Sequence, residues 1–200
     1  MSHVDWNEER DEKAIEPSIV SAGEVLIRPA GPGDLDGIEA LYRVVADQTQ
    51  GLARCCDEIS RSYVIEFMQH SRERGIELVA ECGGAVIGEL HTYKSGLRVF
   101  DHVMGNLTVA VHPALHGQGV GRRLFAAMFR AVEEQFPEIE RVELVVRESN
   151  QNAIKLYESL KFAIEGRMVG RIRSAQGGVE ADLPMAWHRS MIVTVSGMPD

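Results

Sequence analysis

The sequence predicts one mixed α/β domain, and three patterns support this prediction. Strand-like and helix-like segments alternate through the middle of the chain, where residues 107–136 read as one strand, turn and helix unit. Hairpin signals lie toward both ends, at Gly83-Gly84 and at Gly177-Gly178. A chain of 200 residues with 44% hydrophobic content suits a single core, and no repeat or low-complexity tract divides it.

The domain is expected to span residues 23–190. Before it, residues 1–22 carry six acidic and two basic residues with almost no apolar periodicity, which is typical of a flexible acidic leader. After it, residues 191–200 are interpreted as a tail.

Two helices are expected after a first short strand at residues 24–28. Asp34 is the expected N-cap of the first helix, whose apolar residues recur at spacings of three and four. Residues 48–57 are expected to form a loop. The second helix carries apolar residues from Ile59 to Met68 and is expected to end at Gly75, a residue type typical of helix C-termini.

The middle of the chain is expected to form a hairpin and a central strand. Residues 76–82 and 85–93 flank the paired glycines, so they predict two antiparallel strands. A long loop over residues 94–105 leads to an apolar strand at residues 107–111. A helix with apolar residues at every fourth position follows the next turn and is expected to end at Pro137.

The last third predicts a strand, a capped helix and a closing hairpin. Residues 142–146 form an apolar strand, and Asn150 is expected to cap a helix that continues through residues 153–160. Residues 162–173 and 179–188 are then expected to pair as antiparallel strands.

The turn between the central strand and its helix carries glycines at 117, 119 and 121. Such a turn lets a ligand approach the backbone closely, and it leaves N–H groups free at a helix start whose dipole favours negative charge. The spacing G-x-G-x-G differs from the dinucleotide fingerprint, and Arg122 follows where a Walker loop has Lys. The turn is therefore expected to hold a phosphate, since a turn that only packs a helix rarely needs three alternating glycines.

This stretch resembles motif A of the GNAT N-acetyltransferases, [QR]-x-x-G-x-[GA] after a strand ending in V-x-P, whose loop amides bind the pyrophosphate of acetyl-CoA. One departure is His116, which occupies the position where Arg or Gln is usual. The resemblance implies a GNAT fold, with a mostly antiparallel sheet flanked by helices. It also implies coenzyme contacts along the backbone of the turn and of the central strand, at Gly117, Gln118, Gly119, Val120, Gly121 and Arg122, and at Val109, Ala110 and Val111.

A second stretch resembles motif B of the same family, N-x-x-A-x-x-L-Y-x-x-x-G-F. It begins at Asn150 and reaches Phe162, with Lys161 in place of the usual glycine. The resemblance implies that Tyr157 lies near the thioester sulfur as general acid and that Asn150 contacts the coenzyme. The alternatives are a core aromatic for Tyr157 and a simple helix cap for Asn150, which is compatible with a coenzyme contact.

No general base is identified with the same clarity. Some relatives carry a glutamate on the strand before motif B, at the position where this chain has Val145. Glu89 and His91 share one face of their strand and are the next candidates, acting through water, although a structural role for either is the competing interpretation. Glu143 is interpreted as structural. Nothing near Cys82 suggests a depressed thiol pKa, so direct transfer within a ternary complex is favoured over a covalent route.

Composition excludes several classes of protein. The formal charge is −9, and no basic face suited to nucleic acid or an anionic membrane stands out. The three cysteines lack metal-binding spacing, so no metal is expected and a reducing cytoplasm is favoured. The chain has no signal-peptide pattern and no run of eighteen apolar residues. A homodimer is left open.

The resemblance implies an N-acetyltransferase that uses acetyl-CoA and a primary amine. The segment from Gly178 to Met185 resembles the end of family members that act on free amino acids and related small amines, which favours a small cationic acceptor. The alternatives are a non-catalytic acyl-CoA-binding regulatory domain and a protein N-terminal acetyltransferase that acts on a peptide amine.

Overall fold

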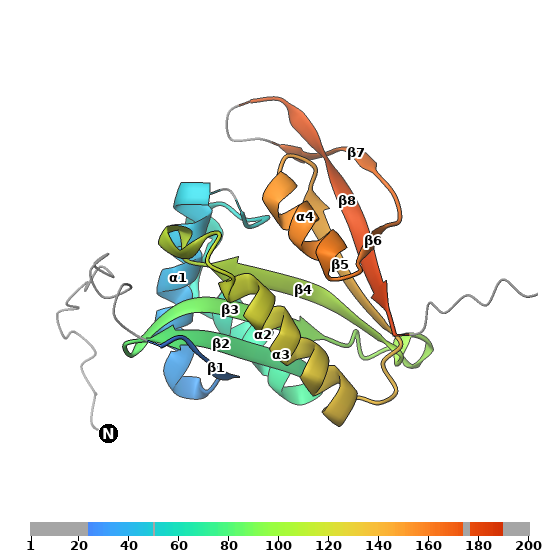
Figure 1. The fold of residues 1–200 in the computed structure, drawn as a ribbon. Helices are drawn as coiled ribbons and strands as arrows, with labels where there is room; N and C mark the ends of the chain where they lie inside the picture. Colours follow the sequence, from blue (N-terminus) through green and yellow to red (C-terminus); the bar gives the residue numbers. More distant parts are fainter. Residues whose placement is uncertain (1–23, 50, 174–176, 190–200) are drawn as a thin grey trace, which may run out of the picture.

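The computed structural model describes residues 24–49, 51–173 and 177–189. Within these ranges the chain forms one sheet with the strand order β1-β2-β3-β4-β5-β8-β6, and β7 pairs with β8 (Figure 1). The strands are β1 Leu26–Pro29, β2 Gly75–Cys82, β3 Ala85–Tyr93, β4 Val103–Val111, β5 Arg141–Arg147, β6 Ala163–Ile164, β7 Met168–Arg173 and β8 Val179–His188. The helices are α1 Leu35–Thr49, α2 Arg61–Arg74, α3 Val120–Gln135 and α4 Gln151–Ser159.

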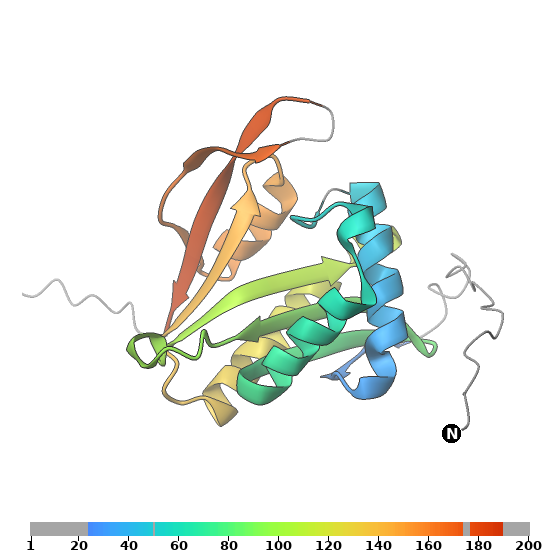
Figure 2. The same cartoon turned by 180° about the vertical axis from the view of Figure 1, so that it is seen from behind.

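Helices cover both faces of the first four strands. Helix α3 lies on one face, and α1 and α2 lie on the other (Figures 1 and 2). The larger hydrophobic cluster joins α3 and α4 to their face of the sheet through residues such as Phe125, Leu144 and Ile154. The smaller cluster packs α1 and α2 against the opposite face. The predicted mixed, mostly antiparallel sheet is confirmed, because the only parallel pair among the described strands is β4 with β5.

Local sequence explains the most regular elements. Gly83 and Gly84 turn the β2–β3 hairpin at φ values of 59° and 83°, which suit glycine. The apolar stripe predicted for α3 is buried against the sheet, at Val120, Leu124, Phe125, Met128 and Val132.

The start of the first helix differs from the prediction. Asp34 is not the N-cap of α1; it ends a short 3₁₀ turn, Pro32–Asp34, that precedes the helix. Its carboxylate accepts hydrogen bonds from the Gly31 N–H at 2.7 Å and from both terminal nitrogens of the Arg28 guanidinium, at 2.7 and 2.8 Å. The ion pair with Arg28 on β1, which sequence spacing does not reveal, holds Asp34 in this position.

Two further boundaries differ because partners distant in sequence decide them. Strand β4 begins at Val103 instead of 107, since Val103 and Met104 pair with Arg141 and Val142 of β5. The expected strand over residues 162–173 is divided into β6 and β7, which pair with different parts of β8. The leader and the tail lie outside the described residues.

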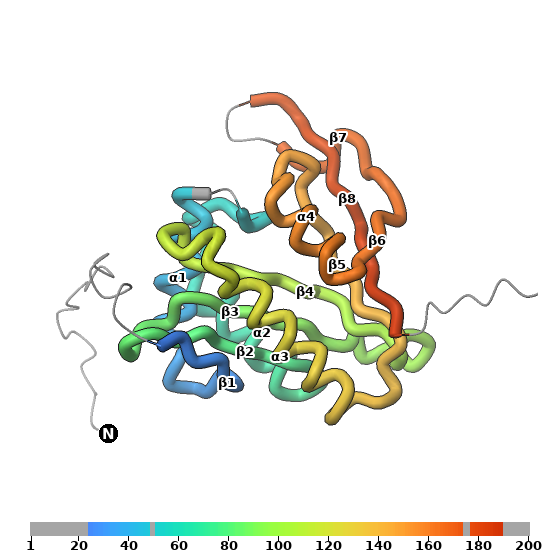
Figure 3. Tube along the Cα trace, viewed as in Figure 1, coloured from blue at the N-terminus to red at the C-terminus, as the bar shows by residue number. Residues whose placement is uncertain are grey.

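The sheet divides between β4 and β5. These parallel strands pair at only two positions, Val103 with Arg141 and Met104 with Val142, after which β5 leaves β4 (Figure 3). Strands β5, β8, β6 and β7 form the second half of the sheet, and α4 packs against it. The C-terminal part of β4 therefore has a strand neighbour on one side only, as far as the described strands go.

None of the helices in the described ranges is both long and apolar enough to cross a membrane.

Candidate functional site

The open edge of β4 is the first part of the site. His112 donates its N–H to the Ile87 carbonyl at 2.9 Å, and the antiparallel register continues with Ala110 opposite Glu89. Because hydrogen-bonded and non-hydrogen-bonded pairs alternate, Ala110 bonds β3, whereas Val109 and Val111 direct their backbone groups toward the side that β5 has left. Ala110 is also fully buried. Among the three strand residues singled out by the sequence, the register favours Val109 and Val111 for backbone contacts to a ligand.

The glycine turn follows this edge. Gly117 and Gly119 adopt φ values of 78° and 82°, and a Cβ on either would meet no atom within 4 Å. Gly119 is the N-cap residue of α3, so the N–H groups that follow it point away from the helix without partners inside the helix. The Gln118 N–H differs, since it donates to the Leu115 carbonyl at 3.3 Å. The turn thus combines an open surface with a helix N-terminus that attracts anions.

His116 ties the turn to the strand. Its Nε2 lies 2.9 Å from the Val111 carbonyl oxygen, where the ring nitrogen donates. The pKa of the neighbouring His112 is lowered by burial and by the proximity of His116. The residue that departs from motif A therefore anchors the loop to β4 through its side chain.

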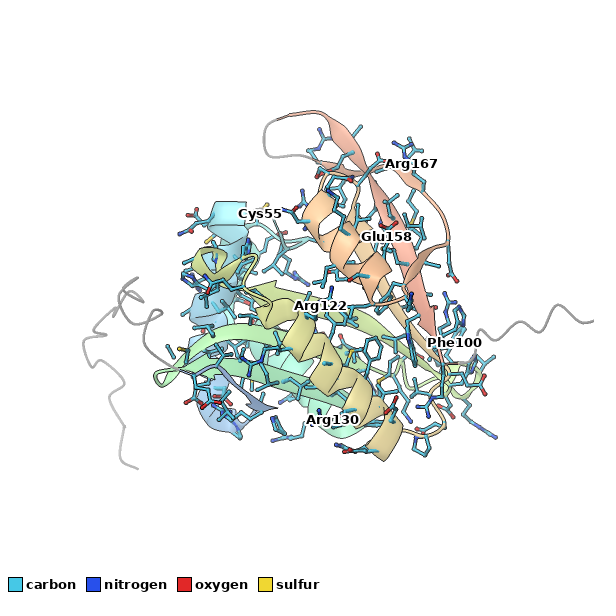
Figure 4. The ribbon with its side chains drawn as sticks, in the orientation of Figure 1. Cys55, Phe100, Arg122, Arg130, Glu158 and Arg167 are labelled. Carbon is cyan, nitrogen blue, oxygen red and sulfur yellow. The ribbon has the colours of Figure 1, made fainter. Side chains whose placement is uncertain are left out.

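Helix α4 lies next to the glycine turn. A Cβ on Gly121 would lie 3.4 Å from Leu156 Cδ2 and 3.9 Å from Val111 Cγ2, so β4, α3 and α4 approach one another there. Arg122, labelled in Figure 4, lies between α3 and α4 and donates from Nη2 to the Ser159 hydroxyl at 2.7 Å. A Cβ at position 121 would therefore make ordinary van der Waals contacts with both neighbouring elements.

Tyr157 lies on the face of α4 that packs against α3. Its ring meets Phe125 edge to face with centroids 5.6 Å apart, and burial raises the pKa of its phenol well above the ordinary value. Asn150 caps α4 as predicted, because its Oδ1 accepts from the Ala153 N–H at 3.2 Å. The side chain of Asn150 is thereby engaged.

Glu89 lies on the opposite face of the sheet, beneath α1 and α2, and is fully buried. The Tyr42 hydroxyl donates to Glu89 Oε2 at 2.5 Å, and His91 Nδ1 lies 3.1 Å from Oε1. The His91 ring stacks on Phe67 with centroids 4.1 Å apart. Burial and the nearby Glu89 charge raise the pKa of Tyr42, which keeps this phenol protonated as a donor. Glu89 and His91 share a face as predicted, but they are committed to each other and to Tyr42.

Tyr42 was not predicted to be part of this cluster, because its partner Glu89 is 47 residues away and its own helix has an ordinary apolar stripe. Val145, in the position where some relatives have glutamate, is exposed. Glu143 accepts a hydrogen bond from Arg141 Nε at 2.6 Å, which supports its structural interpretation.

Arg147 at the end of β5 donates to the Leu52 carbonyl at 3.3 Å, so the loop after α1 reaches the second half of the sheet.

No group of three or more metal-ligating side chains gathers within residues 24–49, 51–173 and 177–189. Cys82 is buried in the sheet, and Cys55, labelled in Figure 4, is exposed in the loop after α1.

Comparison with known proteins identifies the family of this chain. The model described as the acetyltransferase (GNAT) family matches residues 38–162. None of the curated proteins matches the sequence.

Among solved structures, a GNAT acetyltransferase from Streptococcus pneumoniae is similar at a TM-score of 0.75 and 21% identity, over 82% of this chain and 99% of the other. A putative acetyltransferase from Salmonella typhimurium, solved with its cofactor acetyl-CoA, gives 0.73 and 20%, over 88% and 98%. A ribosomal-protein-alanine N-acetyltransferase from Brucella melitensis gives 0.71 and 23%, over 82% and 99%. At these identities the similarity establishes the fold.

Proposed function

Because the chain belongs to the acetyltransferase (GNAT) family, we propose that it transfers the acetyl group of acetyl-CoA directly to the primary amine of a small cationic molecule. The observation that carries this proposal is the convergence of three features at one place. These are the open edge of β4 at Val109 and Val111, the glycine turn, and helix α4, which approaches Gly121 through Leu156.

The backbone supplies the coenzyme contacts in this proposal. The N–H groups of Gly119, Val120, Gly121 and Arg122 at the start of α3 bind the pyrophosphate, with Gly117 leaving room for it. The Gln118 N–H is already bonded to the Leu115 carbonyl within the turn, so in this proposal Gln118 shapes the loop and does not donate to the pyrophosphate. The pantetheine arm then follows the open edge of β4, where it replaces the missing strand through hydrogen bonds to the backbone of Val109 and to the Val111 N–H, since the Val111 carbonyl already accepts from His116. Asn150 holds the start of α4 beside the arm.

The chemical step joins the amine nitrogen to the thioester carbonyl carbon and breaks the carbon–sulfur bond. The departing thiolate takes a proton from the Tyr157 hydroxyl, and the attacking nitrogen loses one to solvent. Burial keeps the Tyr157 phenol protonated at neutral pH, as a general acid must be before the transfer.

The acceptor must lose a proton before it attacks. An alkyl ammonium titrates near pH ~10, so only a small fraction is nucleophilic at neutral pH. Val145 offers no carboxylate, and Glu89 is buried and bonded to Tyr42 and His91, so we propose that ordered water removes the proton, with Glu89 acting only at the end of a water path. Turnover should then rise with pH through the neutral range.

The charge balance supports a cationic acceptor, since a protein of formal charge −9 attracts cations. The test is acetyl-CoA turnover across a panel of small amines, amino acids and peptides, followed by release of the coenzyme thiol. Turnover with a small amine that rises with pH from the mildly acidic to the mildly alkaline range supports the proposal. Much faster acetylation of peptide or protein N-termini would overturn the acceptor class, and coenzyme binding without turnover on any amine would favour a regulatory domain.

A further inference from the structure

A cavity of about 350 Å³ lies at the opposite edge of the first half of the sheet from β5. Strand β1 ends at Pro29, opposite Leu78. On that side of β2, the described residues before Leu78 have no strand neighbour, and the Ala30 N–H makes one hydrogen bond to the Glu77 carbonyl. The cavity occupies this gap, with α2 on one face of the sheet and the C-terminal part of α3 on the other (Figures 1 and 2). None of its lining residues belongs to β4, the glycine turn or α4.

The walls are mostly apolar. Pro32, Leu35, Ile65 and Met68 line one side, and Ile76, Leu78 and Ala131 line the other. A cavity of this size and character accommodates a small organic molecule.

Two polar atoms in these walls have no hydrogen-bond partner among the described residues. Ser71 is 1% exposed, and its Oγ is one of them. Glu77 Oε1, also buried, is the other. An unpartnered buried polar atom destabilises the protein, and a ligand that supplies hydrogen-bond donors recovers that cost.

The charges around Glu77 determine which charge the ligand should carry. Burial raises the pKa of Glu77 to about 8, and the negative charges of Glu89 and Asp34 add to the effect. Asp34 is already paired with Arg28, and Glu89 with His91 and Tyr42. Arg72 lines the cavity but is exposed and makes no ion pair with Glu77. The buried carboxyl group therefore sits in a negative potential that a cation would relieve.

We propose that this edge cavity binds a small organic cation, an ammonium group on an apolar body, with the ammonium hydrogen-bonded to Glu77 and the body against the apolar walls. Ser71 supplies an acceptor for a second N–H of the ammonium group. The proposal does not depend on the acceptor of acetyl transfer, since the cavity and the coenzyme turn share no residue.

The test uses hexylammonium as the probe, titrated calorimetrically into the protein saturated with coenzyme A, which carries no acetyl group to transfer. We expect saturable binding, and we expect hexan-1-ol, a neutral molecule of the same chain length, to bind at least about tenfold more weakly. Since Glu77 is largely protonated at neutral pH, binding should release about one proton, measured by repeating the titration in buffers of different ionisation enthalpy.

Variants connect the binding to the cavity. Glu77→Gln should weaken binding by about tenfold or more, whereas Glu158→Gln, the same change on the exposed surface of α4 and outside the cavity, should not alter it. Ala131→Leu adds a larger side chain to the α3 wall of the cavity and should also weaken binding. This variant tests the proposal if the Glu77→Gln protein does not fold. Absence of binding to the coenzyme-saturated protein, equal affinity for the alcohol, or unchanged affinity in the Glu77 and Ala131 variants would overturn the proposal, whatever the turnover assay gives.

Discussion

The two halves of the sheet differ in how completely they are enclosed. In β1 to β4, helices cover both faces, and even a carboxylate, Glu89, is fully buried among partners. In β5 to β8, α4 covers one face, while Val145 on the other is 49% exposed. Only two backbone positions join the halves within the described strands. The first half is therefore a platform enclosed on both faces, and the candidate site lies where the second half separates from it.

In the proposed mechanism, this difference separates the chemical tasks. The platform would contribute backbone groups of β4 and the N-terminus of α3, whose directions are set by hydrogen-bonded elements. The second half would contribute a side chain, Tyr157, on a helix of nine residues. Variants in each half should consequently alter different steps, with binding assigned to the platform and turnover to α4.

The largest expected effect belongs to the second half. Tyr157→Phe should lower kcat by ~10²-fold and leave coenzyme affinity nearly unchanged, because the ring packing on Phe125 is kept and only the proton donor is lost. Steady-state kinetics and a coenzyme titration measure the two quantities. Tyr93→Phe is the matched control, since it removes a phenol from β3 in the platform. Full turnover in the Tyr157→Phe enzyme would make Tyr157 a core residue.

A smaller effect, on binding, is expected in the platform. Gly119→Val should weaken coenzyme binding by about tenfold or more, because valine resists a φ of 82° and displaces the N–H groups at the start of α3. Calorimetric titration of the folded variant measures the loss.

Gly84→Val provides the control for strain alone. Gly84 has a φ of 83° and equally open surroundings, but it turns the β2–β3 hairpin. Both variants should lose similar stability, on the order of 1–2 kcal/mol, from the left-handed conformation. If the Gly84 variant lost as much coenzyme affinity as the Gly119 variant, the turn would have no special part in binding.

The sequence predicted the features that depend on local spacing. The glycines of the turn, the stripe of α3 and the Asn150 cap each follow from residues within one or two turns of one another, and each is present. The family, the fold and the enzyme class followed from the same local motifs.

Features that depend on distant partners were not predicted. The Asp34 carboxylate binds the Arg28 guanidinium and does not cap α1. The Tyr42 hydroxyl donates to Glu89, which is 47 residues away in the sequence. The edge cavity arises because β1 ends before β2 does, which no spacing in either strand indicates. Such contacts are decided by tertiary packing, so a single sequence gives no signal for them.

The buried polar cluster of the platform yields a third expectation, on stability. Tyr42→Phe should lower the free energy of unfolding by about 1–3 kcal/mol, because it removes the phenol that donates to Glu89 Oε2 inside the core. Urea unfolding measures this loss. Tyr63→Phe, on the neighbouring ring 6.2 Å away, is the control for removing a less buried hydroxyl.

Turnover of the same variant tests the role of Glu89. An unchanged kcat in the folded Tyr42→Phe protein would assign the cluster to stability alone. A fall in kcat with altered pH dependence would instead support Glu89 as the end of a proton path.

The smallest effect is expected at the junction of the halves, where Arg141 begins β5. Its guanidinium bonds Glu143, Glu165 and His188, and it lowers the pKa of Glu165 from its ordinary 4.5 to about 2, with His188 assisting. A pKa that is lower in the folded state means stability that is fully present above about pH 4.5 and is lost as the pH falls toward 2. Because the Glu165 side chain is 37% exposed, solvent screening limits the contribution to about 1 kcal/mol or less.

Urea unfolding at neutral pH and at two pH values between about 4.5 and 2 measures this contribution by comparing the natural protein with Glu165→Gln. The variant should be less stable at neutral pH, and the gap should narrow as the pH falls, because protonation of Glu165 removes the same charge that the substitution removes. Glu158→Gln, on the exposed surface of α4 (Figure 4), should show no such narrowing. A gap that stays constant across this range would mean that Glu165 stabilises the second half by packing and not through its charge.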